Sequence, residues 1–112
     1  MQTIMIFNDN ESNFDLMIKF NGDMENIKAK FPAHKKAEFL NYAKLMYFQI
    51  LSEVLYTYTK IVLKKPWPEA EPIILADTFS PQTAAYCMKI LLMSRDEFED
   101  WKRHRENGGR II

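Results

Sequence analysis

Few side chains in this sequence have the types and spacing that a reactive site requires. The two histidines, His34 and His104, lie 70 positions apart on different predicted elements. Each is next to a lysine or an arginine, and neither has a second ligand at the spacing that a metal ion needs. Cys87 is the single cysteine, and it falls on the apolar side of a predicted helix, where a thiol usually packs as a small core residue. We therefore predict no metal site, no cofactor, no catalytic residue and no enzymatic activity.

An acidic cluster is the strongest remaining candidate for general acid–base chemistry, and its members are Asp96, Glu97, Glu99 and Asp100. Ser94 and Glu97 have the spacing of a capping box at the start of a helix. Acidic side chains in the first turns of a helix also interact favourably with its dipole. We interpret the cluster as structural rather than catalytic.

Three lysines, Lys60, Lys64 and Lys65, lie at the end of a long predicted helix. Cations stabilise the carbonyl end of a helix, and this is the interpretation that we favour. Phosphate binding by these lysines is the alternative. The sequence contains no glycine-rich phosphate loop that would support it.

The stretch AAYCMKILLMSRDEFEDWKR, residues 84–103, resembles a helix-turn-helix, in which the second helix enters the major groove of DNA. The resemblance implies a DNA-binding regulator that uses the unit 84–105, with Lys102, Arg103 and Arg105 as the DNA contacts. Two departures weaken this alternative. Leu92 stands near the position of the usual glycine, and the acidic cluster on the second helix would be repelled by phosphates.

The N-terminal part of the sequence predicts a β-hairpin. Apolar residues alternate with other residues over 14–20, which is the period of a half-buried strand. Residues 3–7 form a second apolar run, and the turn formers at 8–12 join the two. A short helix is expected over 24–31, ended by Pro32.

One long central helix is predicted over 33–64, because this stretch contains neither glycine nor proline. Its apolar stripe covers about half of the circumference, which is more than the roughly 100° that a surface helix normally buries. Further apolar residues fall on the opposite half: Tyr42, Leu45, Met46, Tyr56 and Leu63. Unless the shorter helices cover them, such residues mark an interaction surface.

Proline-rich residues 64–72 follow as an extended linker, and 73–77 form either a third short strand or a buried loop. Two shorter C-terminal helices are expected, one capped by Ser80 and one by Ser94. The fold class predicted for residues 1–112 is therefore α+β in a single domain. The expected core consists of Phe14, Leu16, Ile18, Phe20, Ile50, Val54, Met88, Leu91, Phe98 and Trp101.

The composition argues against two further classes of protein, nucleic-acid binders and membrane-spanning proteins. Fifteen basic and fifteen acidic residues cancel, so the chain lacks the basic footprint of a typical nucleic-acid binder. Lys44, Glu53 and Lys60 interrupt the long apolar segment, so no membrane span is expected. A single cysteine and the lack of a secretory signal predict a cytoplasmic protein.

We conclude from the sequence that the chain is a non-catalytic protein–protein interaction module, such as an inhibitor, an adaptor or an immunity-type protein. It is expected to act as a homodimer or by covering the surface of a partner protein. The residues predicted to touch the partner are Tyr42, Met46, Tyr56 and Trp67.

Overall fold

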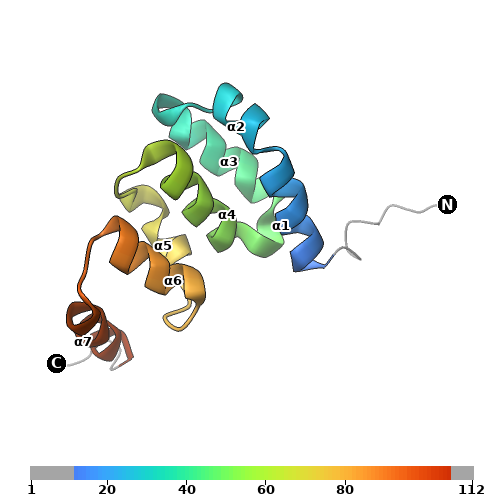
Figure 1. The fold of residues 1–112 in the computed structure, drawn as a ribbon. Helices are drawn as coiled ribbons and strands as arrows, with labels where there is room; N and C mark the ends of the chain where they lie inside the picture. Colours follow the sequence, from blue (N-terminus) through green and yellow to red (C-terminus); the bar gives the residue numbers. More distant parts are fainter. Residues whose placement is uncertain (1–11, 107–112) are drawn as a thin grey trace. The chain divides into compact units, whose positions relative to one another are not determined.

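The computed structural model describes residues 12–106, and every regular segment in this range is helical (Figure 1). The α-helices are α1 (Asn13–Gly22), α2 (Met24–Lys30), α3 (Lys36–Met46), α4 (Leu51–Tyr58), α5 (Glu71–Ile74), α6 (Pro81–Ala85) and α7 (Arg95–Glu106). Short 3-10 segments are η2 (Ala33–Lys35), η3 (Phe48–Ile50) and η5 (Pro68–Ala70). Two π-helical segments, η4 (Thr59–Leu63) and η6 (Tyr86–Ile90), continue α4 and α6.

The chain divides into two compact units, Met1–Ile50 and Leu51–Ile112, and each is described by itself. The boundary falls inside the segment that the sequence predicts as one long helix. Whether the whole chain behaves as a single domain stays a prediction.

The predicted α+β fold is wrong for the described residues, because 14–20 form part of α1 and not a strand. A cap starts this helix: the backbone N–H of Asp15 donates to the Oγ of Ser12 at 3.0 Å. Residues 3–7, the other predicted strand, lie outside the described residues.

The alternation that suggested a strand places apolar residues on two opposite sides of α1. Residues two apart are about 200° apart around a helix. Leu16 and Phe20 are therefore buried together on one side, while Phe14 and Ile18 are exposed on the other. The same four residues would have shared one face of a strand.

The predicted long helix over 33–64 is also wrong, because the chain leaves the α-helical conformation at Tyr47 (φ −132°, ψ 36°). The Tyr47 ring is buried and packs edge-on against Phe20, with ring centroids 5.2 Å apart. Phe20 also contacts Phe39 on α3. This aromatic cluster forms the centre of unit 1, and burial raises the pKa of Tyr47 to about 12. The helix breaks where Tyr47 packs against another helix. No glycine or proline in this stretch of the sequence predicts the break.

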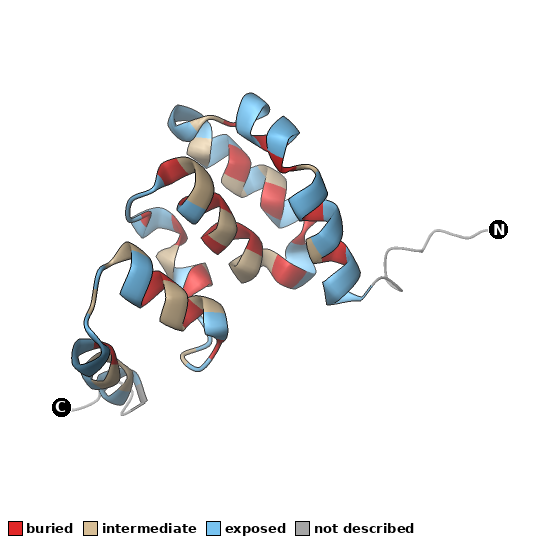
Figure 2. Cartoon of the chain, in the orientation of Figure 1, coloured by how far each residue is buried: buried red, intermediate tan, exposed pale blue. Residues whose placement is uncertain are grey.

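The core of unit 2 is built around Trp67, which lies between helices and not in an exposed linker. Its ring is 5.4 Å from that of Tyr58, and its backbone N–H donates to the Oη of Tyr86 at 2.8 Å. The Tyr86 hydroxyl in turn donates to the Oε2 of Glu71 at 2.7 Å. Figure 2 shows buried positions on α4, α5 and α6, the helices around this core.

Of the two alternatives for 73–77, the short strand is wrong, because α5 ends at Ile74 and the next residues form turns. The buried hydroxyl of Thr83 donates to the carbonyl oxygen of Asp77 at 2.7 Å. This bond satisfies a backbone acceptor in the loop, which a strand would have paired with a neighbouring strand.

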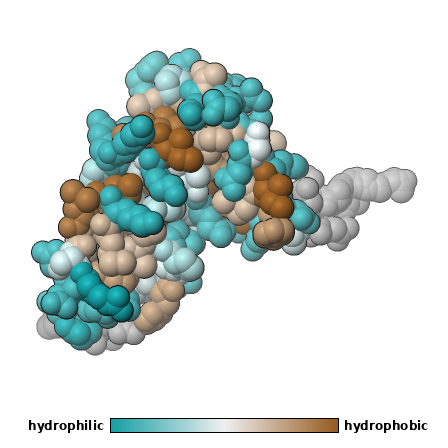
Figure 3. All heavy atoms as spheres, in the orientation of Figure 1, coloured by the Kyte–Doolittle hydropathy of each residue, from teal (hydrophilic) through white to brown (hydrophobic). Residues whose placement is uncertain are grey.

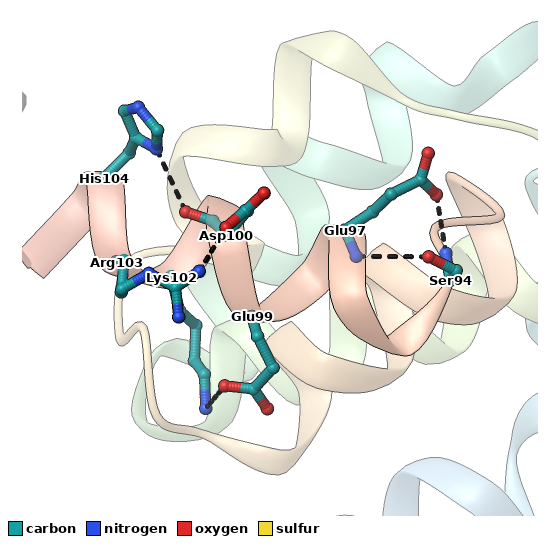
Figure 4. A network of polar contacts seen from close by, with 7 residues as sticks. All are labelled: Ser94, Glu97, Glu99, Asp100, Lys102, Arg103 and His104. Carbon is teal, nitrogen blue, oxygen red and sulfur yellow. Dashed lines mark hydrogen bonds and ion pairs between the residues drawn. The ribbon is translucent and has the colours of Figure 1, made fainter.

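The two C-terminal helices are confirmed together with their caps. Ser80 Oγ accepts from the N–H of Thr83 at 3.2 Å. In the capping box of α7, the N–H of Glu97 donates to Ser94 Oγ at 3.1 Å (Figure 4). The N–H of Ser94 donates to Glu97 Oε1 at 2.7 Å. Both start signals were readable in the sequence because a cap depends on local residues alone.

Replacing Ser94 with alanine is expected to destabilise α7 by about 1 kcal/mol, because the N–H of Glu97 loses its acceptor. Amide hydrogen exchange in the first turn of α7 measures the change. Glu97→Gln is the control, since glutamine keeps an acceptor oxygen for the N–H of Ser94. Unchanged exchange in the alanine variant would contradict a stabilising cap.

Half of the predicted core is confirmed as buried: Leu16, Phe20, Ile50, Val54 and Phe98. Phe14, Ile18 and Met88 are exposed, which corrects the prediction for these three. Leu91 and Trp101 are only partly buried. Trp101 stacks on Phe98 with ring centroids 5.9 Å apart, so it covers the edge of the core rather than entering it.

Candidate interaction surface

The outer side of α1 carries an exposed apolar stripe, which we call the α1 stripe and define as Phe14, Ile18 and Gly22. These residues are four apart, so they follow one another along a single side of the helix. Phe14 is 73% exposed and Ile18 is 55% exposed. A Cβ atom at Gly22 would meet no atom within 4 Å. The packing of this chain therefore does not require a glycine there, whereas a closely approaching partner helix would benefit from one.

Opposite charges flank the α1 stripe on one side. Asp15 lies in the first turn of α1 and Lys19 in its last turn, and both are exposed. The two are one helical turn apart, at the edge of the stripe. A second helix that runs antiparallel to α1 would therefore meet an acidic and then a basic group along this edge.

More exposed apolar side chains follow at the end of unit 1, on α3 and η3: Leu45, Met46 and Phe48. The segment η3 packs against α1. Figure 3 shows hydrophobic surface over α1, among predominantly hydrophilic surroundings. Exposed apolar residues that adjoin one another on a surface are typical of sites that bind another protein.

The four predicted partner-binding residues lie in different environments. Met46 is 57% exposed and remains a surface residue. Tyr42 is partly buried in the aromatic cluster of unit 1, with its ring 5.1 Å from that of Phe31. Tyr56 is 9% exposed and Trp67 only 1%, so neither forms part of an exposed surface.

Sequence reasoning missed Phe14 and Ile18 as surface residues because it placed them in the core of a sheet. The signal that would have found them is the same alternation drawn on a helix. A helix with apolar pairs on two opposite sides buries one pair and presents the other. Assigning 14–20 to a strand instead of a helix therefore placed Phe14 and Ile18 in the predicted core instead of on the predicted surface.

The residues predicted to contact DNA are engaged within α7. Lys102 pairs with Glu99 at 3.4 Å, and Arg103 pairs with Asp100 (Figure 4). The guanidinium of Arg105 lies 4.9 Å from the centroid of the Trp101 ring. With five acidic and four basic residues, α7 has no cationic excess to attract phosphates.

The segment that joins η6 to α7 does have the conformation of a tight turn. Leu92 has a positive φ of 62°, the region that usually requires glycine. The helix pair therefore forms with leucine at the glycine-like position. This turn supports the geometry of two connected helices, but it adds no group that recognises DNA.

The candidate catalytic and metal-binding side chains are not brought together within residues 12–106. No group of three or more His, Cys, Asp or Glu side chains in this range could hold a metal ion. Cys87 is buried, as predicted, and burial raises the pKa of its thiol to about 11. His34 is exposed, and Nδ1 of His104 lies 3.1 Å from the carbonyl oxygen of Asp100. The absence of enzymatic activity stays a prediction.

The part of the chain that the structure describes contains no helix with the length and apolar character needed to cross a membrane. Comparisons with protein-family models, with curated proteins and with solved structures give no match to this chain.

Proposed function

We propose that this chain is a protein–protein interaction module that acts as a homodimer through the α1 stripe. The observation that carries the proposal is the exposure of Phe14 and Ile18 on a helix whose other side is firmly packed by Leu16 and Phe20. Exposed aromatic and aliphatic side chains on an ordered helix bind with little loss of conformational entropy, because the helix is already formed.

The charges beside the stripe favour a second copy of the chain as the partner. In a two-fold symmetric pair, residue i meets residue j and residue j meets residue i. With the axis near Met17, two antiparallel α1 helices would place Asp15 of each copy beside Lys19 of the other. The edge of the stripe is therefore self-complementary in charge.

Replacing Ile18 with aspartate is expected to weaken dimerisation roughly tenfold to 100-fold, because a charge would be buried against an apolar partner surface. Sedimentation equilibrium over a range of protein concentrations measures the dissociation constant. Ala29→Asp is a matched control, since Ala29 is also an exposed position on a helix of unit 1. We expect this control to dimerise as the unmodified chain does.

The charge pattern gives a separate test of the antiparallel arrangement. Asp15→Lys or Lys19→Asp alone should weaken the dimer through like charges, and the double exchange should restore it. A chain that is monomeric at every measured concentration would overturn the homodimer. Equal weakening by Ile18→Asp and Ala29→Asp would show that the contact lies elsewhere.

The proposal includes a cytoplasmic location for the module. The single cysteine supports it, because Cys87 has no second cysteine in the sequence with which to form an internal disulfide.

A further inference from the structure

Unit 2 contains an open surface cavity of about 390 Å³ that four exposed lysines line together: Lys60, Lys64, Lys65 and Lys89. The remaining wall is apolar and includes Ile90 and Leu92. Lys60 lies within η4, Lys64 and Lys65 follow directly after it, and Lys89 lies in η6. Only the fold brings Lys89 to the others, since 24 positions separate it from Lys65 in the sequence.

The backbone around this cavity is unusual at two points. Lys64 and Leu92, which both line it, have positive φ angles of 57° and 62°. They are the non-glycine residues within 12–106 that adopt this conformation. Both π-helical segments end here as well, with the N–H of Lys64 donating to the carbonyl of Thr59 at 2.7 Å. Strained backbone and π-helical turns are both enriched at functional sites.

The negative ends of the helix dipoles offset only part of the positive charge of the four lysines. Two helix ends meet at the cavity, and each contributes roughly −0.5 charge, so together they offset about one of the four lysines. The ion pairs found within residues 12–106 lie in α2 and α7 and involve none of these lysines. Lys60 is held near the Tyr56 ring, at 5.6 Å from its centroid. After this offset, about three positive charges remain among the four lysines, and none of them forms an ion pair within the described residues.

We propose that this cavity binds a small organic molecule carrying a diphosphate group, with the phosphates on the lysines and an apolar portion against Ile90 and Leu92. The cavity volume lies within the range of small-molecule sites, about 300–1,000 Å³. Lysine is a common phosphate ligand that acts as a point charge. The mixture of cationic and apolar wall distinguishes this site from a surface that attracts any anion. Figure 3 shows hydrophilic and hydrophobic surface side by side in unit 2.

The test is isothermal titration calorimetry of the full-length chain with inorganic pyrophosphate, adenosine diphosphate and sulfate. We expect one saturable site per chain for the two diphosphates, tighter binding of the nucleotide through the apolar wall, and no measurable site for sulfate. Higher salt should weaken binding, because the lysines are exposed to solvent and are screened. Nucleotide and pyrophosphate of equal affinity would overturn the role of the apolar wall.

Variants distinguish binding at this cavity from a general effect of the positive charge of the chain. Lys64→Gln combined with Lys89→Gln is expected to lower the affinity for pyrophosphate roughly tenfold to 100-fold, since two charge-assisted contacts are lost. Arginine at the same two positions should retain binding. Lys28→Gln combined with Lys36→Gln removes the same charge from unit 1 and should leave the affinity unchanged. Equal losses in both glutamine variants, or no saturable diphosphate binding by the unmodified chain, would overturn the proposal.

Discussion

Replacing Trp67 with alanine is expected to lower the free energy of unfolding of unit 2 by about 3–5 kcal/mol. The side chain is almost completely buried and packs against Tyr58, so its removal leaves a large cavity. The backbone N–H of residue 67 remains available for the Tyr86 hydroxyl, and the cost is therefore mainly one of lost packing. Urea denaturation followed by circular dichroism measures it.

Trp101→Ala is the control for this prediction. Trp101 is partly exposed and lies at the edge of the core, so its truncation should cost much less. Equal losses for Trp67 and Trp101 would contradict a central position of Trp67 in unit 2.

The second large effect is expected in unit 1. Phe20→Ala should destabilise that unit by about 3–5 kcal/mol, because the ring is completely buried between Phe39 and Tyr47. Phe14→Ala, the same substitution on the same helix, should change stability by less than about 0.5 kcal/mol in the monomer. Both are measured by urea denaturation at a concentration where the chain is monomeric.

This pair of variants decides between helix and strand at residues 14–20. On a strand, Phe14 and Phe20 would share a face, and the two substitutions would have similar costs. On α1 they point to opposite sides, and the costs differ several-fold. Similar values for the two variants would reject α1 as described.

The same experiments test whether the chain unfolds as a single domain. Both tryptophans, Trp67 and Trp101, lie in unit 2, so tryptophan fluorescence follows that unit alone. Circular dichroism follows the helices of both units. If the chain is one cooperative domain, Phe20→Ala will shift the fluorescence transition as much as the dichroism transition. Independent units would leave the fluorescence transition of this variant unchanged.

Signals that depend on adjacent residues were predictable from the sequence. Ser80 and Ser94 cap helices as expected, and α2 ends before Pro32. The position of Cys87 on the apolar side of its helix was also readable from the sequence. Each of these features needs only a few neighbouring residues, and distant contacts do not change them.

Features that depend on distant contacts were not predictable in the same way. Tyr47 leaves the helical conformation within a sequence that contains no helix breaker, where its ring packs against Phe20 from another helix. The 3-10 turn at Phe48–Ile50 then changes the angular position of every later residue. A single helical wheel through 33–64 therefore placed Tyr56 on the outside, although it is buried.

The same distinction between adjacent residues and distant contacts applies to the candidate sites. An excess of exposed apolar surface was expected on the predicted helix over 33–64, where Met46 is exposed but Tyr56 is buried. The exposed Phe14 and Ile18 were instead assigned to the core. Lys60, Lys64 and Lys65 were recognised as a group because they are close in sequence. Lys89 joins them only through the folded arrangement of η4 and η6.

The two-sided pattern of α1 has a consequence for the unfolded chain. A segment with alternating apolar residues over 14–20 satisfies the pattern of a β-strand whenever the helix is not formed. Released from its contacts with Tyr47, this segment is able to pair edge to edge with the same segment of other molecules. At high protein concentration, such intermolecular pairing would compete with the folding of unit 1.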